Sequence, residues 1–224
     1  MNLRNLLVVT TMVFVTHCLF AQRNYQGEYN RIGLQGGLSI FDITTDNFTT
    51  SSSEGFTAGF TTRGAFYNDF DLIYGVNFYD LNVDIQARET ALSEVEEVSF
   101  GIFGVQLNLF ASYNLIGQHL TIEAGPAVQL SSKLTTDDKN QDYIIDGYNT
   151  LRAEDLEDVS KINVNAVIGI TGGFESVRFW ANYQYGINNF LNGLNDEGLE
   201  QIDPNVEEFN GNISLINVGV VFYL

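Results

Sequence analysis

Residues 214–224 read SLINVGVVFYL, and every second side chain of this stretch is apolar, from Ile216 to Leu224. Strict alternation of this kind is typical of a β-strand whose two faces meet different surroundings. The same alternation is present in seven earlier stretches, which are 31–40, 55–66, 71–80, 103–113, 120–130, 161–174 and 177–187. No helical period of comparable strength is present. The sequence therefore predicts an all-β protein with eight strands.

The segments between these stretches alternate in length as regularly as the strands do. Four are long and polar, at 44–54, 86–97, 133–161 and 191–212. Three are short, at 68–70, 114–117 and 175–176. Short turns on one side and longer loops on the other are the layout of outer-membrane barrels. We predict an eight-stranded antiparallel up-and-down transmembrane β-barrel with four long outer loops and three short periplasmic turns.

The polar face of the predicted strands carries uncharged amides and hydroxyls rather than lysine and glutamate. A water-facing sheet normally carries charged side chains, so this face favours the crowded lumen of a narrow barrel, with the apolar face against lipid. An exported soluble β-barrel, with the apolar face inside, is the alternative. The residues of the polar face are Gln35, Ser39, Thr57, Thr61, Asn77, Tyr79, Gln106, Asn108, Thr121, Gln129, Asn163, Asn165, Thr171, Asn182, Gln184 and Asn217.

The first residues have the pattern of a secretory signal peptide. Arg4 precedes an apolar run over 6–20, and Ala21 ends a small-residue cleavage site. A transmembrane anchor is the alternative, but the run is shorter than the ~20 residues that a spanning helix needs. Export through a cleaved signal peptide is consistent with a barrel in the outer membrane.

We therefore divide the chain into three parts. The signal peptide is expected at 1–21, a short periplasmic segment at 22–30 and the barrel domain at 31–224. The single cysteine, Cys18, falls in the predicted signal peptide, so we expect no disulfide framework in the mature protein.

The chain is strongly acidic, with 28 Asp and Glu against 10 Lys and Arg and a net charge of −18. Such a charge argues against nucleic-acid binding, which needs a basic surface. Most of the acidic residues fall in the long segments and adjoining strand tips, so we expect an acidic crown at the outer end. The crown could bind divalent cations, surface polysaccharide or a basic partner, or could serve only as a solvated, repulsive surface.

Neither an enzyme nor a metal site is predicted. The segment 138–142 carries oxygen ligands with calcium-loop spacing, but Tyr143 replaces the required glycine and Asn149 the final glutamate. After the predicted cleavage His119 is the single histidine, and it lies beside a short turn, away from the acidic crown. Hydrolases of outer-membrane barrels need a histidine next to a nucleophile or acid. We expect no catalytic, cofactor-binding or metal-binding residues.

A small group of charged residues interrupts the polar face near its short-turn end. The group consists of Arg31, Arg63, Glu123 and Arg178. Unpaired buried charges are costly, so we expect Glu123 to pair with Arg63 or Arg178. The group is either a structural plug or part of a gated pore or proton path. The narrow lumen of eight strands favours the plug.

Several stretches resemble the PorT-like outer-membrane β-barrel family of Bacteroidetes. These are GLQGGLSIF at 33–41, IEAGPAVQLSSKL at 122–134, INVNAVIGITGGFE at 162–175, RFWANYQYGINNF at 178–190 and INVGVVFYL at 216–224. The strongest match is YQYGINN at 183–189, which is similar to the family's tyrosine-glycine-leucine-threonine-asparagine strand end.

This resemblance implies a small eight-stranded outer-membrane barrel and brings no catalytic residues with it. The namesake branch is associated with type IX protein secretion. We expect a barrel with a filled lumen, acidic loops and a structural or interaction role. The alternative is an accessory subunit of an envelope machine such as type IX secretion, and a small-solute porin is less favoured by the barrel size. Expected partners are outer-membrane lipid, the barrel insertion machinery and an envelope protein.

Overall fold

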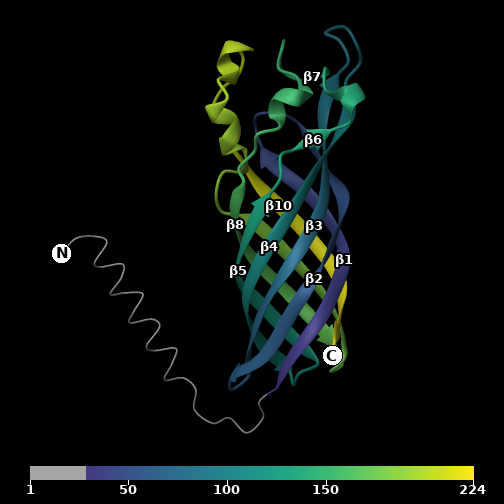
Figure 1. Ribbon diagram of the computed structural model, residues 1–224, viewed down its shortest axis with the longest axis vertical. Helices are drawn as coiled ribbons and strands as arrows, with labels where there is room; N and C mark the ends of the chain where they lie inside the picture. The colour runs from purple at the N-terminus through teal and green to yellow at the C-terminus, as the bar shows by residue number, and fades with distance from the viewer. Residues whose placement is uncertain (1–28) are drawn as a thin grey trace, which may run out of the picture.

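The computed structural model describes residues 29–224, and these residues form a closed antiparallel β-barrel (Figure 1). The last strand pairs with the first, from Gly33 opposite Tyr223 to Thr45 opposite Gly211, so the wall has no free edge along this seam. The predicted eight-stranded up-and-down barrel is confirmed. Its strands are β1 (Asn30–Thr45), β2 (Thr50–Tyr67), β3 (Phe70–Arg88), β4 (Glu96–Ile116), β5 (Leu120–Ser131), β8 (Ile162–Gly173), β9 (Val177–Gly186) and β10 (Gly211–Tyr223).

The two ends of the barrel differ in the way the strands are connected. At one end the turns are short, and Asn68 in the first of them has a positive φ of 51°, which asparagine tolerates well. The carboxyl end of the chain lies at this end (Figure 1). The opposite end carries β6 (Thr135–Thr136), β7 (Ile144–Ile145) and the 3₁₀ helices η1 (Asp138–Asn140), η2 (Ala153–Leu156), η3 (Phe190–Asp196) and η4 (Leu199–Gln201).

Two of the four outer connections are shorter than the sequence suggests, because the strands continue into them. β1 and β2 are joined by 46–49, and β3 and β4 by 89–95. The ladder between β3 and β4 runs without interruption up to Ala87 opposite Glu96. More than half of the polar segment 44–54 and both ends of the segment 86–97 therefore belong to the barrel wall.

Five of the strands reverse their polarity part of the way along their length. On β3, Tyr74 and Phe78 point outward and are exposed, and Asp80 follows them on the same outer face. The inner face of this strand changes in the opposite sense, from buried Asn77 to buried Leu81. Comparable changes occur on β1 after Ile40, on β2 at Phe56, on β4 at Phe103 and on β10 at Ile216.

These changes divide the barrel into two halves. The lower half extends from the short turns to the reversal points and has an apolar outside. The upper half extends from there to the long loops and has an apolar inside. In Figure 1 the lower half is at the bottom of the view.

The interior of the upper half is a hydrophobic core that strands and loops build together. Phe41 of β1 is fully buried, and its ring packs edge-on against Phe190 of η3 at a centroid distance of 6.3 Å. The same core contains Leu151 and Leu156 from the loop between β5 and β8 and Ile85 from β3. The long loops therefore fold into the mouth of the barrel and close it.

The predicted signal peptide at 1–21 lies outside the described residues. Among the residues that the structure describes, no helix is long and apolar enough to cross a membrane.

Pro126 lies inside β5 and interrupts the pairing of β5 with β4. The register of the two strands is the same on either side of the interruption. Proline has no N–H to donate, so this interruption is its expected local effect.

Candidate functional site

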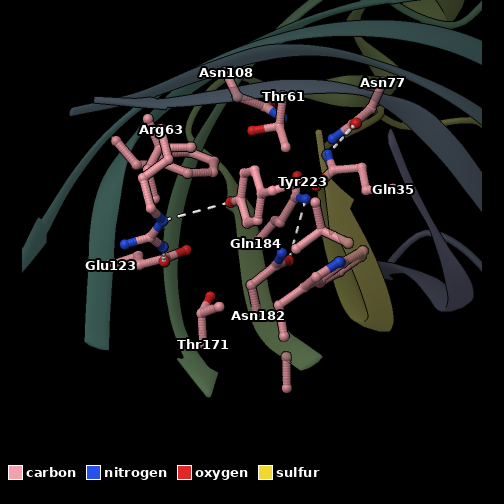
Figure 2. Close-up of a pocket in the computed structure, with 15 residues that line it drawn as sticks. Gln35, Thr61, Arg63, Asn77, Asn108, Glu123, Thr171, Asn182, Gln184 and Tyr223 are labelled. Atoms are coloured by element: carbon pink, nitrogen blue, oxygen red, sulfur yellow. Dashed lines mark hydrogen bonds and ion pairs between the residues drawn. The ribbon is translucent and has the colours of Figure 1, made fainter. Parts of the chain in front are cut away.

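The most concentrated group of buried charges lies in the lumen of the lower half and centres on Arg63. Its guanidinium is buried and contacts two carboxylates, Asp71 at 3.0 Å and Glu123. The three residues come from β2, β3 and β5, and each is on the inner face of its strand. Figure 2 shows Arg63 and Glu123 pointing toward one another across the lumen. We call Arg63, Asp71, Glu123 and Arg178 the lumen plug.

Neutral side chains complete the contacts of Arg63. Its Nη1 donates to Ser112 Oγ at 3.0 Å. Its Nε donates to the Tyr223 hydroxyl at 3.4 Å, as Figure 2 shows. Because β10 pairs with β1, the aromatic ring near the end of the chain is brought into the lumen beside β2. A planar guanidinium has five donors in a fixed geometry, so these partners fix its position from several sides.

Arg178 is the second buried cation of the lumen plug, and it reaches Glu123 indirectly. Its Nη2 donates to the carbonyl oxygen of Thr171 at 3.3 Å and to Thr121 Oγ1 at 3.4 Å. The Thr121 hydroxyl donates in turn to Glu123 Oε1 at 3.1 Å. Two arginines and two carboxylates balance within the plug, which is the condition under which buried charges are tolerated.

Arg31 belongs to the rim rather than to the buried plug. Its side chain lies 3.6 Å from the carboxylate of Glu175, which is largely exposed, and its guanidinium lies over the Tyr29 ring. Arg31 is opposite Arg63 on the neighbouring strand, but it contacts Glu175 at the rim, whereas Arg63 contacts the buried carboxylates.

Asp71 is the member of the plug that the sequence analysis missed. It is the second residue of β3, and its neighbour Leu72 was correctly placed on the outer face. Because strand side chains alternate, Asp71 had to lie on the inner face. It is opposite Ala65, two positions from Arg63 on the same face, which puts it within reach of the guanidinium.

Above the plug, the lumen is filled by side-chain amides and hydroxyls. Gln184 Nε2 donates to the Tyr79 hydroxyl at 3.1 Å, and Ser39 Oγ donates to Asn217 Oδ1 at 2.6 Å. A cavity of about 40 Å³, lined by these amides and by Arg63 and Glu123, has room for a few water molecules. The lumen therefore consists of a charge-balanced plug, a layer of polar contacts and the apolar core of the upper half.

At the outer end, four basic residues form ion pairs with acidic neighbours. Lys133 is 2.9 Å from Asp158, and Lys139 is 3.6 Å from Asp137. Two further pairs, Arg88 with Asp146 and Arg152 with Asp142, also involve the loop between β5 and β8. In contrast, no lysine or arginine follows Arg178 in the sequence, so the loop between β9 and β10 is acidic only.

One acidic residue of the crown, Asp203, is fully buried and joins the two large loops. Its Oδ2 accepts from the backbone N–H groups of Asn149 and Thr150, both at 2.5 Å, and its Oδ1 accepts from Asn205 at 2.9 Å. Burial alone raises the pKa of a carboxyl, but these backbone hydrogen bonds outweigh burial and hold the pKa of Asp203 below its usual value. On the sequence alone Asp203 counts as one of the surface charges of the crown, because nothing local to it reveals the partner loop.

The residues considered for catalysis or metal binding are engaged elsewhere. His119 Nδ1 lies 3.0 Å from the Gly173 carbonyl oxygen, beside a short turn. In the segment with calcium-loop spacing, residues 138–140 form η1, and Asp142 pairs with Arg152. Within residues 29–224, no group of three or more His, Cys, Asp or Glu side chains is arranged to hold a metal ion.

Comparison with known proteins gives structural likenesses only. No protein-family model matches the chain, and no curated protein does. The outer membrane protein OprG from Pseudomonas aeruginosa is similar at 12% identity and a TM-score of 0.46, over 90% of this chain and 99% of OprG. Neisserial surface protein A is similar at 12% identity and a TM-score of 0.44, over 85% of this chain and 96% of that protein.

Ail of Yersinia pestis, the attachment invasion locus protein, is a third similar structure. It has 11% identity and a TM-score of 0.45, over 87% of this chain and 99% of Ail. At this level of similarity, none of the three tells us what this chain does.

Proposed function

We propose that this chain is an integral protein of the outer membrane. The observation that carries the proposal is the reversal of polarity, because an apolar outside over a polar inside is stable only in lipid. On β1 the apolar outside runs from Ile32 to Ile40, both exposed. Nine residues at about 3.3 Å each, tilted by about 40°, give a height of roughly 20 Å, close to that of the apolar band of outer-membrane barrels.

Exposed aromatic side chains at both borders of the lower half support the same proposal. Aromatic girdles mark the two interfaces of transmembrane barrels. Near the short turns the exposed rings are Phe66, Tyr67, Phe70, Tyr113, Phe174, Phe179 and Phe222. Near the reversal points they are Phe56, Phe78, Phe103 and Tyr185.

Cysteine labelling in whole cells tests this placement, because Cys18 is the single cysteine of the chain and falls in the expected signal peptide. Leu92 is 98% exposed at the tip between β3 and β4, and Asp69 is exposed in the first short turn. A membrane-impermeant maleimide should label Leu92→Cys in intact cells and Asp69→Cys only after the outer membrane is opened. Equal labelling of the two variants in intact cells contradicts the proposal.

The proposed role is structural or interactive, without catalysis and without conduction. The charge-balanced plug and the apolar core above it leave room for a few waters, which supports a sealed lumen. Single-channel recording of the purified protein in planar bilayers should show no steady conducting steps. Such steps in the wild-type protein contradict the sealed lumen and favour a small-solute pore.

The alternative role is that of an accessory subunit in an envelope machine, as the resemblance to the PorT-like family suggests. The upper half supports an interaction role, because its hydrophobic core gives the loops a fixed arrangement outside the lipid. Gentle detergent extraction, native gels and mass spectrometry distinguish the two roles. A stoichiometric envelope protein in the same complex favours the accessory role, and a monomer favours the structural one.

A further inference from the structure

The last residue of β10, Tyr223, is joined to the lumen plug across the seam of the barrel. Its ring lies on the inner face, and the Nε of Arg63 donates to its hydroxyl at 3.4 Å (Figure 2). Arg63 belongs to β2, so the ring has to cross β1 to reach it. The contact therefore joins two strands that are not neighbours in the wall, directly inside the seam between the first and the last strand.

Gly33 of β1 leaves the space that this ring needs. It is opposite Tyr223 of β10 on one side and Thr61 of β2 on the other. A Cβ atom on Gly33 would lie 2.9 Å from Cδ1 and 3.1 Å from Cε1 of the Tyr223 ring, and 2.7 Å from Cγ2 of Val221. Carbon atoms pack at about 3.5–4.0 Å, so any side chain at this position would displace the ring. Aromatic rings that cover a strand glycine also help to fix strand register.

The other neighbour of β10 has a similar arrangement. Trp180 of β9 is opposite Gly219 of β10, and a Cβ atom on Gly219 would lie 2.6 Å from Cζ2 of the indole. Trp180 and Tyr223 both line the lumen cavity. The last strand is therefore covered on its inner side by a ring from β9, and it places a second ring over β1.

The position of the ring distinguishes one register of the seam from the others. The ladder from Gly33 to Thr45 has regular pairing at every residue, and a slip of two residues would keep each side chain on its own face. Two positions from Gly33 on the inner face are Arg31 and Gln35. Their side chains would occupy the place of the Tyr223 ring, so the observed register is the one in which the ring meets a glycine.

The charged partners of Arg63 do not depend on the seam. Arg63, Asp71 and Glu123 lie on β2, β3 and β5, and these strands follow one another in the wall with β4 between the last two. The three side chains can meet once these four strands have paired. Tyr223 reaches them only after β10 has joined β1. The contact between Arg63 and Tyr223 is therefore made by the closed barrel alone.

We propose that Gly33, Arg63 and Tyr223 form a closure latch. The latch fastens the last strand to the first from inside the lumen, selects the register of the seam and slows its opening. The lumen plug then has a second role besides filling the lumen. The latch needs only the closed barrel, so its test is independent of the proposed role in the cell.

Hydrogen exchange of the full barrel in nanodiscs, measured by mass spectrometry in moderate urea, reports the opening of individual strands. The peptide 211–224 covers the last strand, and the peptide 96–116 covers β4, which is not part of the seam. Tyr223→Phe removes the hydroxyl and keeps the ring. Tyr79→Phe is the matched control, because it removes another buried tyrosine hydroxyl, which lies on β3 and accepts from Gln184 Nε2.

Tyr223→Phe should raise the exchange rate of 211–224 about fivefold and leave that of 96–116 within about twofold, because a hydrogen bond is lost at the seam alone. Tyr79→Phe should not favour the last strand over β4. Unchanged exchange of 211–224 in Tyr223→Phe overturns the latch. An equal rise in both peptides shows a general loss of stability and overturns it as well. So does a selective rise at the seam in Tyr79→Phe, which shows that the seam is merely the weakest part of the wall.

A double-mutant cycle tests the passage of the ring over Gly33. Gly33→Ala should raise the exchange rate of 211–224 about tenfold, because the added methyl group meets the ring. In a Tyr223→Ala background the same substitution should have an effect at least about threefold smaller, and the contact with Val221 cancels because it is present in both backgrounds. If Gly33→Ala alone does not fold, recovery of the folded barrel in the double variant is the readout. Equal effects in both backgrounds, or no recovery, overturn the role of Gly33.

Discussion

The two halves of the barrel have opposite arrangements of polarity and share five strands, β1 to β4 and β10, because β5, β8 and β9 end near the reversal points. In the lower half, apolar side chains such as Leu107 point outward, and amides and the lumen plug fill the inside. In the upper half, Phe41 and its neighbours fill the inside, and the outside is polar. The ladder between β3 and β4 runs through the boundary without interruption, so on these strands the surroundings of the wall set the side-chain pattern.

The comparison shows that different forces hold the two halves together. The outside of the lower half gains little from burial, because lipid is as apolar as a protein core. Its specificity comes from the closed backbone ladder and the polar contacts of the lumen. The upper half is stabilised in the ordinary way, by removing apolar surface from water. The following variants separate these contributions.

The largest effect is expected in the lumen plug. Arg63→Met leaves Asp71 and Glu123 buried without their cation, which should lower the free energy of unfolding by about 5 kcal/mol. Urea unfolding from lipid vesicles measures the loss. The control combines Arg63→Met with Asp71→Asn and Glu123→Gln, which removes the buried charges together and should recover most of the stability. If the triple variant is as unstable as the single one, charge pairing does not explain the effect.

A slightly smaller loss is expected in the core of the upper half. Phe190→Ala removes a fully buried ring and should cost about 4 kcal/mol. Phe179 is the matched control, because its ring is 69% exposed on the outside of the lower half and lipid can take its place. Phe179→Ala should cost clearly less in the same unfolding experiment. Equal costs for the two variants argue against the assignment of the halves.

A charge on the outer face tests where lipid ends. Leu107 and Ser99 both point outward from β4, the first in the lower half and the second in the upper half. Leu107→Arg should destabilise the barrel in lipid by about 3 kcal/mol, and Ser99→Arg should leave it nearly unchanged. Vesicle-based unfolding of both variants checks this. A similar penalty at both positions shows that the lipid boundary is placed wrongly.

The smallest of the four effects concerns the contact between the two large loops. Asp203→Asn should cost about 2 kcal/mol at neutral pH, because the backbone N–H groups lose a charged acceptor. The folded pKa of Asp203 is lowered, so its contribution is complete above the unfolded pKa of about 3.9 and is lost as pH falls through the folded value. The difference in stability between wild type and variant should therefore shrink below about pH 4. A difference that stays constant down to pH 2 rules out the ionised carboxylate as its source.

Much of the fold could be predicted from the sequence, because period-two alternation is a local property of each strand. The outward set from Tyr74 to Phe78 and the inward amides Asn77 and Gln106 are placed as the alternation indicates. The second alternating set on β3, which includes Leu81, Val83 and Ile85, has the opposite phase. This set falls between the predicted strand at 71–80 and the predicted loop at 86–97, although it forms wall with its apolar side inside.

The candidate site was less accessible from the sequence. Alternation placed Arg63 and Glu123 on the inner face, but the choice between Arg63 and Arg178 as partner of Glu123 depends on register across several strands. The contact of Asp203 with residues 149–151 joins loops that are about fifty positions apart in the chain. Neither contact leaves a local pattern.

The sequence by itself determined the number of strands, the side of the short turns and the polarity of the lumen, because each depends on neighbouring residues along one strand. The tertiary structure decided how far the wall extends above the apolar band and which charges meet in the lumen plug. These features arise from register and loop packing, which bring together side chains that are distant in the chain.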